Sequence, residues 1–162
     1  MDTTNRKQFQ VTEDILAKLQ FRFFNFIIDM LMLVILVFIV LVFIIGITTA
    51  NGDKDFINRF MVNNLWQYML TSGVTLLYYN FFEIFASRTV GKFCTNTIVV
   101  DENGNKVNYE AIMIRSLVRI IPLYWLSFFI FPTRGLHDMI SKTFVVNKKL
   151  LEEKKQQFYA IK

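Results

Sequence analysis

One long and mostly apolar stretch, residues 23–47, constrains the fold of this chain more than any other feature. As a helix it is long enough to cross a bilayer core roughly 30 Å thick. Asp29 is the one charged residue inside it, and Arg22 and Asn25 precede Asp29 by about two turns and one turn. These three side chains therefore share one helix face. A carboxylate in a membrane is costly unless a cation, a polar group or water meets it, so we expect polar partners for Asp29 elsewhere in the chain.

The composition indicates one compact membrane domain. Of the 162 residues 54% are hydrophobic and 16% are aromatic. The basic residues behind the net charge of +5 flank apolar segments and form no separate basic module, which argues against a nucleic-acid partner. Cys94 and His137 are the only residues of their kinds, so the chain has no pair for a disulfide and lacks the usual zinc ligands. The polar first twenty residues and the length of the apolar run argue against a cleaved signal peptide.

A second membrane helix is predicted over residues 65–86. Polar residues recur there at spacings of three and four, which makes a polar stripe that a lipid-facing helix would not need. The loop between the two helices, residues 51–64, carries only Lys54 and Arg59 as cations, whereas residues 88–119 carry five. The excess of cations on cytoplasmic loops predicts that this loop lies outside and that both termini lie in the cytoplasm.

A small cytoplasmic β-hairpin is predicted over residues 95–109. Residues 95–100 are rich in β-branched side chains, and Asn103-Gly104 is typical of a type I′ turn. Residues 106–109 would supply the returning strand.

The third apolar segment, residues 111–131, is predicted to be broken or re-entrant. Pro122 interrupts it just beyond Arg115 and Arg119. The tail that follows, residues 147–162, is basic and helical in pattern, and a complete crossing would place it outside against the charge rule. The expected fold is thus an all-α membrane protein with two transmembrane helices, a third partial one and the hairpin. A third crossing that begins near residue 111 is the alternative.

Several short motifs follow one another in a characteristic order along the chain. They are Arg22, Asp29, Tyr78-Tyr79, Glu83, Arg88-Thr89-Val90-Gly91-Lys92, Ile98-Val99-Val100-Asp101, Gly104, Arg115, Arg119, Leu136-His137-Asp138 and Thr143-Phe144-Val145-Val146. Their order and spacing resemble the RDD family of bacterial membrane proteins, and the resemblance covers about residues 21–146. The family takes its name from one arginine and two aspartates, which correspond here to Arg22, Asp29 and Asp138. Ser87 stands where a glycine is common in the family, and Val90 where a proline is common.

The resemblance implies a bacterial inner-membrane protein that passes the membrane several times. Some members of the family are associated with exchange of Na⁺ or Li⁺ for protons, and others stand beside membrane or secretion components. Independently of the resemblance, the possible N-cap Thr12 and the apolar residues at helical spacing after it predict a short interfacial helix over 12–20. The expected division is a cytoplasmic N-terminal segment over residues 1–20, the membrane domain over residues 21–146 and a basic cytoplasmic tail over residues 147–162.

The candidate site consists of polar residues expected at similar depth in the cytoplasmic half. Read as a cation or proton site, it would use Asp29 and Glu83 with Asn25 and Tyr79 as further ligands, since oxygen donors suit hard cations. Read as structural glue, the same charges would pin the helices together, which is the commoner role for any single polar residue in a membrane. Both interpretations stay open for the Asp29 and Glu83 pair. The residues expected in the structural charge cluster are Arg22, Arg115, Arg119 and Asp138.

Two neighbouring residues receive separate predictions. Asp138, besides its place in this cluster, could be a third ligand of the ion site, but the cap of a helix that begins near Met139 is the favoured role. The sequence Thr89-x-Gly91-Lys92 lacks the upstream glycine and the strand of a phosphate loop, so Lys92 is expected to contact lipid phosphate rather than a nucleotide.

Two functional hypotheses follow. The first is a small antiporter that exchanges Na⁺ or Li⁺ for protons as a homo-oligomer, because so few short spans cannot enclose a pathway alone. The alternative is a non-transporting accessory or scaffold subunit of a larger membrane complex. The sequence shows no catalytic constellation, so we expect no enzyme activity and no cofactor apart from a transported ion. The expected partners are the bilayer, further copies of the chain and other membrane proteins.

Overall fold

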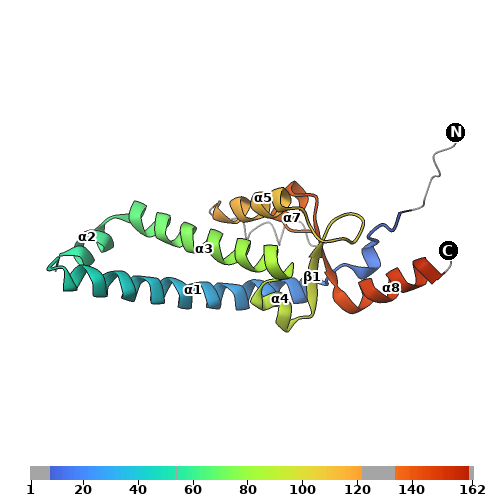
Figure 1. The fold of residues 1–162 in the computed structure, drawn as a ribbon, viewed down its shortest axis with the longest axis horizontal. Helices are drawn as coiled ribbons and strands as arrows, with labels where there is room; N and C mark the ends of the chain where they lie inside the picture. Colours follow the sequence, from blue (N-terminus) through green and yellow to red (C-terminus); the bar gives the residue numbers. More distant parts are fainter. Residues whose placement is uncertain (1–7, 54, 122–133, 161–162) are drawn as a thin grey trace.

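Two long antiparallel helices form the body of the protein. The computed structural model describes residues 8–53, 55–121 and 134–160. Helix α1 (Leu19–Ala50) runs to one end of the molecule, where α2 (Phe56–Val62) turns the chain into α3 (Asn64–Ala86). Residues 8–18, both strands and the last helix gather at the opposite end (Figure 1). The helices predicted over 21–50 and 65–86 are thus present, and the loop expected at 51–64 contains the short helix α2.

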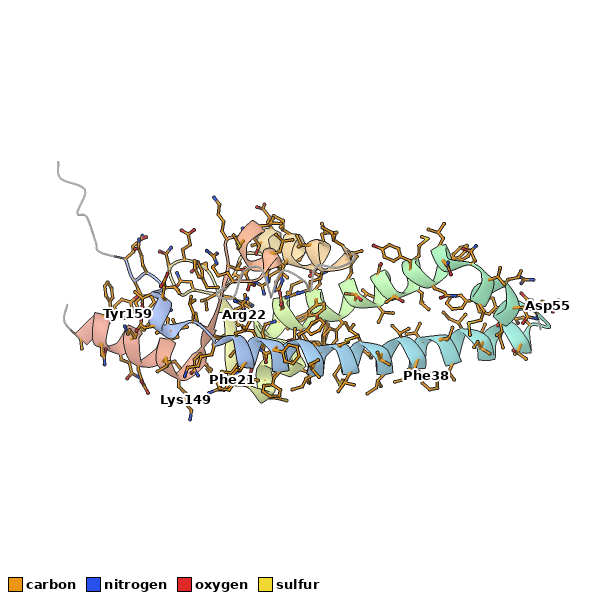
Figure 2. The ribbon with its side chains drawn as sticks, turned by 180° about the vertical axis from the view of Figure 1, so that it is seen from behind. Phe21, Arg22, Phe38, Asp55, Lys149 and Tyr159 are labelled. Carbon is orange, nitrogen blue, oxygen red and sulfur yellow. The ribbon has the colours of Figure 1, made fainter. Side chains whose placement is uncertain are left out.

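Helix α1 carries apolar side chains that nothing in the described chain covers. It has 32 residues, roughly 48 Å of helix. By length and composition it is the one helix in the described residues that could cross a membrane. Phe38 points away from α3 (Figure 2) and is 63% exposed, as Phe43 is at 68%. Soluble proteins rarely expose apolar patches of this extent, so a lipid environment accounts for this surface.

The polar residues of α1 lie on its buried side. Arg22, Asn25 and Asp29 are the buried residues of this 32-residue helix, as the shared-face argument predicts. Helix α4 (Val90–Cys94) crosses α1 at this face, and α3 packs beside it. The interior of the protein between α1, α3 and α4 is therefore polar, whereas the outer surface of α1 is apolar.

The turn between α3 and α4 has the backbone geometry that suits the glycine and the proline that Ser87 and Val90 replace. Ser87 ends α3 with φ of 55°, a left-handed conformation that costs a residue with a side chain about 1–2 kcal/mol and costs glycine little. Val90 is the first residue of α4, the helical position that proline tolerates best. The geometry that favours glycine and proline is therefore kept here with Ser87 and Val90.

The hairpin predicted over residues 95–109 is wrong, because the strand that pairs with β1 comes from a distant part of the chain. Strand β1 (Thr97–Val100) pairs antiparallel with β2 (Phe144–Asn147), with Thr97 opposite Asn147 and Val100 opposite Phe144. Val145 and Val146 are 4% and 0% exposed, and this apolar pair gives β1 a better-buried partner than the polar residues 101–106 do. Only one isolated bridge, Val100 with Lys106, remains of the hairpin.

The turn after β1 also differs from the predicted type I′ geometry. Asp101 N–H donates to the carbonyl of Asn105 at 3.0 Å, which closes a loop of three residues. Gly104 has φ of 71°, whereas Asn103 is not among the residues with positive φ. A three-residue loop that ends in a left-handed glycine needs one such residue, and a type I′ turn needs two. The Asp101 carboxylate accepts the N–H groups of Asn103 and Asn105 and stabilises this loop.

The N-terminal segment joins the sheet instead of forming the predicted interfacial helix over 12–20. A single 3₁₀ turn, η1 (Glu13–Ile15), is followed by extended residues, and Ala17 N–H donates to the carbonyl of Val145 at 2.9 Å. Helix α8 (Lys148–Ala160) continues directly from β2. Residues 8–18, β1, β2 and α8 together are called the terminal cap below. Its core consists of Phe9, Ile15, Val100, Val146 and Leu151.

The third apolar segment is described only in part. Helix α5 (Tyr109–Ile120) packs along α3, where the Ser116 hydroxyl meets the Asn80 amide oxygen at 3.1 Å. Helix α7 (Leu136–Ile140) packs on α5 and leads into β2. Residues 122–133 lie outside the described part of the chain, so the broken or re-entrant course predicted for 111–131 stays a prediction.

The topology can be tested by cysteine labelling in whole cells. A cysteine introduced by Asp53→Cys, at the α2 end, should react with a membrane-impermeant maleimide, while native Cys94 at the opposite end should react only after permeabilisation. Cys94 is exposed on the protein, so burial would not explain its protection. The reverse labelling pattern would contradict the predicted orientation.

Candidate functional site

Seven charged side chains are buried together where five helices converge. They come from α1, α3, α4, α5 and α7, and each is at most 6% exposed. Arg22 of α1 pairs with Asp138 of α7. We call this set the buried charge cluster. Its members are Arg22, Asp29, Glu83, Lys92, Arg115, Arg119 and Asp138.

Glu83 is contacted by cations from two other helices. Its Oε1 accepts hydrogen bonds from Lys92 Nζ at 3.1 Å and from Arg119 Nη2 at 2.8 Å. Its Oε2 accepts one from Arg115 Nε at 3.1 Å. Glu83 therefore ties α3 to α4 and α5, and both of its oxygens are engaged by positive charge.

Asp138 is the second centre of the cluster. Its carboxylate pairs with Arg22 from α1 and accepts from Arg115 Nη1 at 2.6 Å. His137 Nε2 lies 3.3 Å from the same carboxylate. The prediction that Asp138 caps a helix is wrong, because Asp138 lies inside α7 and Gly135 occupies the N-cap position. Arg115 thus bridges Glu83 and Asp138, and Arg22 extends the network to α1.

Asp29 is held by neutral donors. Its Oδ1 accepts from the Tyr78 hydroxyl and from the Gly91 backbone N–H, each at 2.8 Å, and its Oδ2 accepts from the Thr89 hydroxyl at 2.6 Å. Neutral donors satisfy a buried carboxylate without a contacting cation, and they spread its charge over several dipoles. The carboxylate that Arg22 bonds is Asp138, so the two family aspartates have different roles.

The other two predicted ligands have structural contacts. The Asn25 side chain lies between the hydroxyls of Thr95 and Thr97, with Thr97 Oγ1 at 3.0 Å. The guanidinium of Arg119 stacks on the ring of Tyr79 at 3.9 Å from its centre. Of the four predicted ion ligands, Asp29, Asn25 and Tyr79 border one small cavity, whereas Glu83 is not among its lining residues.

This cavity has a volume of about 30 Å³, enough to hold a water molecule. Three cationic side chains stand on its wall beside one carboxylate. In the described residues, no group of three or more histidines, cysteines or carboxylates could hold a metal ion. The lining residues are Arg22, Asn25, Phe26, Asp29, Tyr79, Lys92, Arg119, His137 and Val145.

Burial and neighbouring cations shape the protonation of two groups outside the long helices. Burial lowers the pKa of Lys92 to about 8, although the Glu83 carboxylate opposes this shift. The pKa of His137 falls well below its ordinary 6.5, because the imidazole is buried and Arg119, Arg115 and Arg22 all disfavour a further positive charge. His137 is therefore neutral at physiological pH.

Sequence reasoning missed the residues that hold Asp29 and misplaced Lys92. The lysine is 5% exposed and bonded to Glu83, so it does not reach the lipid phosphate predicted for it. Tyr78, Thr89 and Gly91 carry no charge, and only their place in the family motifs singled them out. A Cβ at Gly91 would meet the carbonyl oxygen of Asn25 at 2.4 Å, so the crossing of α4 over α1 requires glycine.

The glycine requirement gives a first prediction for this site. Gly91→Ala should destabilise the protein by about 1–3 kcal/mol or more, because the added methyl group must push α4 away from α1. Gly73→Ala is the matched control, since a Cβ there meets nothing within 4 Å. The midpoint of thermal unfolding in detergent compares the two variants. An equal midpoint for Gly91→Ala and Gly73→Ala would contradict the close crossing.

The neutral histidine gives a second prediction. A group whose pKa is lower in the folded state contributes stability that is present above its ordinary pKa and is lost as the pH falls below it. The wild-type protein should therefore lose stability from about pH 6.5 downward. His137→Gln should lose less between pH 6.5 and 5, because glutamine keeps an N–H donor and does not titrate. Parallel pH profiles of the unfolding midpoint would contradict this assignment.

Comparison with known proteins agrees with the resemblance noted from the sequence. The family model described as the RDD family matches residues 16–142, a range that runs from just before α1 to just after α7. No match was found among curated proteins or among solved structures. The matched range contains each charged residue of the buried cluster. This chain belongs to the RDD family.

Proposed function

We propose that this protein is a non-transporting subunit of a membrane complex, with α1 and α3 in the bacterial cell membrane and the terminal cap in the cytoplasm. The observation that carries the proposal is the engagement of Glu83 by Lys92, Arg115 and Arg119. The three cations within 3.1 Å of this carboxylate outweigh its single negative charge, and their positive charge repels a further cation.

The cluster is well suited to hold the protein together. Alkali and alkaline-earth cations prefer carboxylate, carbonyl and hydroxyl oxygens that are free to bind them. Here the oxygens of Glu83 and Asp138 all accept from protein cations. Polar groups that satisfy one another between helices act as glue in a membrane. Such a closed set of ion pairs supports a structural role for these residues.

The position of the cluster supports a role in presenting the terminal cap. Asp138 in α7 lies six residues before β2, and Thr143, just before the strand, accepts from Arg115 Nη1. Asn25 in α1 contacts Thr97, the first residue of β1. Buried polar contacts thus anchor β1 to α1, and anchor β2 to α5 through the residue that precedes the strand. A partner that binds the cap would be coupled mechanically to the membrane helices.

Exchange of Na⁺ or Li⁺ for protons by several copies of the chain remains the second candidate, and one observation favours it. Asp29 is 3% exposed, borders the small cavity and takes its described hydrogen bonds from neutral groups. A carboxylate in such a setting could exchange a proton without breaking an ion pair. In this candidate function, Asp29 is the one residue that couples proton release to cation binding.

Reconstitution distinguishes the two candidates. In proteoliposomes with a pH-sensitive dye inside, an inward Na⁺ or Li⁺ gradient should cause no more pH change with the wild-type protein than with Asp29→Asn. The Asn variant is the matched control because it preserves the size of the side chain. A cation-driven pH change in the wild type that Asp29→Asn abolishes would contradict the non-transporting function.

The structural role of the cluster predicts a strong coupling between Arg22 and Asp138. Either Arg22→Gln or Asp138→Asn alone should destabilise the protein by about 3–5 kcal/mol, because each removes one partner of a buried ion pair. The double variant should be more stable than the sum of the two losses predicts, by about 1–3 kcal/mol.

The exposed pair Arg59 and Asp53 provides the control cycle. These side chains are 64% and 37% exposed, so Arg59→Gln and Asp53→Asn should show a coupling of about 0–1 kcal/mol. Equal coupling energies for the two pairs, measured by unfolding in detergent, would contradict a stabilising role of the buried cluster.

A further inference from the structure

A second and much larger cavity lies at the α2 end of the molecule, between the end of α1 and the start of α3. Its volume is about 1060 Å³, at the upper end of the roughly 300–1,000 Å³ that is typical of ligand pockets. Ile44 lies six residues before the end of α1, and Leu70 six residues after the start of α3, or about 9 Å of helix in each case. The cavity therefore extends from α2 between the two long helices, at the end of the molecule opposite the terminal cap (Figure 1).

The lining of this cavity changes from polar to apolar. Its polar residues come from α2 and from the residue that joins α2 to α3, and they are Asn58, Arg59 and Asn63. Its residues from the two long helices are all apolar, and they are Ile44, Trp66, Met69 and Leu70. A ligand that fits this lining has an apolar tail between α1 and α3 and a polar group at α2.

Helix α2 itself indicates contact with a membrane surface. It has seven residues, five of them apolar, and none is buried. Phe56 and Phe60 stack on one another, with ring centres 6.0 Å apart, and both line the cavity. So short a helix is marginal in water, and an apolar face without protein cover is stabilised where it lies against lipid. Trp66 on the same wall is of the residue type that favours the level of the lipid headgroups.

The charges beside the cavity are balanced. Residues 51–64 contain two cations, Lys54 and Arg59, and two carboxylates, Asp53 and Asp55, so this segment has no net charge. Arg59 pairs with Asp53, and both side chains are exposed. Such a pair offers a guanidinium to a phosphate group and a carboxylate to an ammonium group. A headgroup with both charges matches this pair better than a headgroup that is only anionic.

We propose that the cavity binds one phospholipid with an ethanolamine headgroup. One acyl chain lies between α1 and α3, the phosphate meets Arg59, and the ammonium group meets Asp53. The proposal rests on the part of the proposed function that places α1 and α3 in the membrane. It holds whether or not the protein transports ions.

Native mass spectrometry of the protein in mild detergent tests the proposal. After removal of copurified lipid, phosphatidylethanolamine or phosphatidylglycerol with the same acyl chains is added at one equivalent. The wild type should bind one phosphatidylethanolamine per chain and less phosphatidylglycerol. Asp53→Asn should reduce phosphatidylethanolamine binding to the level of phosphatidylglycerol, because the partner of the ammonium group is lost.

Two neighbouring substitutions locate the acyl chain. Ile44→Trp should abolish phosphatidylethanolamine binding, because the larger side chain occupies the space between the helices. Phe43→Trp is the matched control, since Phe43 is exposed and does not line the cavity. Equal binding by these two variants would overturn the proposal, as would a wild type that binds no phosphatidylethanolamine or binds phosphatidylglycerol equally well.

Trp66 provides a second measurement if Ile44→Trp does not fold. In Trp125→Phe, Trp66 is the one remaining tryptophan of the chain. One equivalent of phosphatidylethanolamine with brominated acyl chains should quench its fluorescence, and an excess of the unbrominated lipid should restore it. Unchanged fluorescence would overturn the proposal.

An alkaline carbonate wash of the membranes separates this proposal from the one on which it rests. The protein should stay in the washed membranes. Its release would overturn both the membrane placement and the lipid site, whereas a retained protein that binds no phosphatidylethanolamine overturns the lipid site alone.

Discussion

The hydrogen bonds of Arg115 hold the interior of this protein together. This side chain is fully buried in α5 and bonds Glu83 of α3 on one side and Asp138 of α7 on the other. A buried guanidinium is stable only where its donors meet acceptors in fixed geometry. The helices around it therefore have to stay at defined distances. Arg22, Lys92 and Arg119 extend the same requirement to α1 and α4.

This constraint explains how a largely apolar chain keeps a unique arrangement in a membrane. Between helices in lipid there is little hydrophobic driving force, so packing and polar contacts decide which helices associate. The surfaces of α1 and α3 are apolar and nonspecific, whereas the charge cluster has one consistent set of partners. The cluster also lies next to both strands, so the terminal cap and the helices are positioned by the same contacts.

Much of the helical framework could be predicted from the sequence, and the pairing of distant segments could not. Apolar length and polar periodicity are local properties, so α1, α3 and the buried face with Arg22, Asn25 and Asp29 followed from them. The pairing of Thr97–Val100 with Phe144–Asn147 joins residues 44 to 50 positions apart, and the local turn signal at Gly104 favoured a nearer partner. The neutral donors to Asp29 were missed because hydroxyl and backbone N–H groups carry no charge signal in a sequence.

The central claim is that the buried charge cluster fastens the terminal cap to the long helices. Hydrogen–deuterium exchange of Asp138→Asn, compared with the wild type in the same detergent, tests it most directly. If the claim is right, amides of β1, β2 and the first turns of α1 exchange faster in the variant, while the α2 end is unchanged. Unchanged exchange in both strands of a folded Asp138→Asn protein would contradict it.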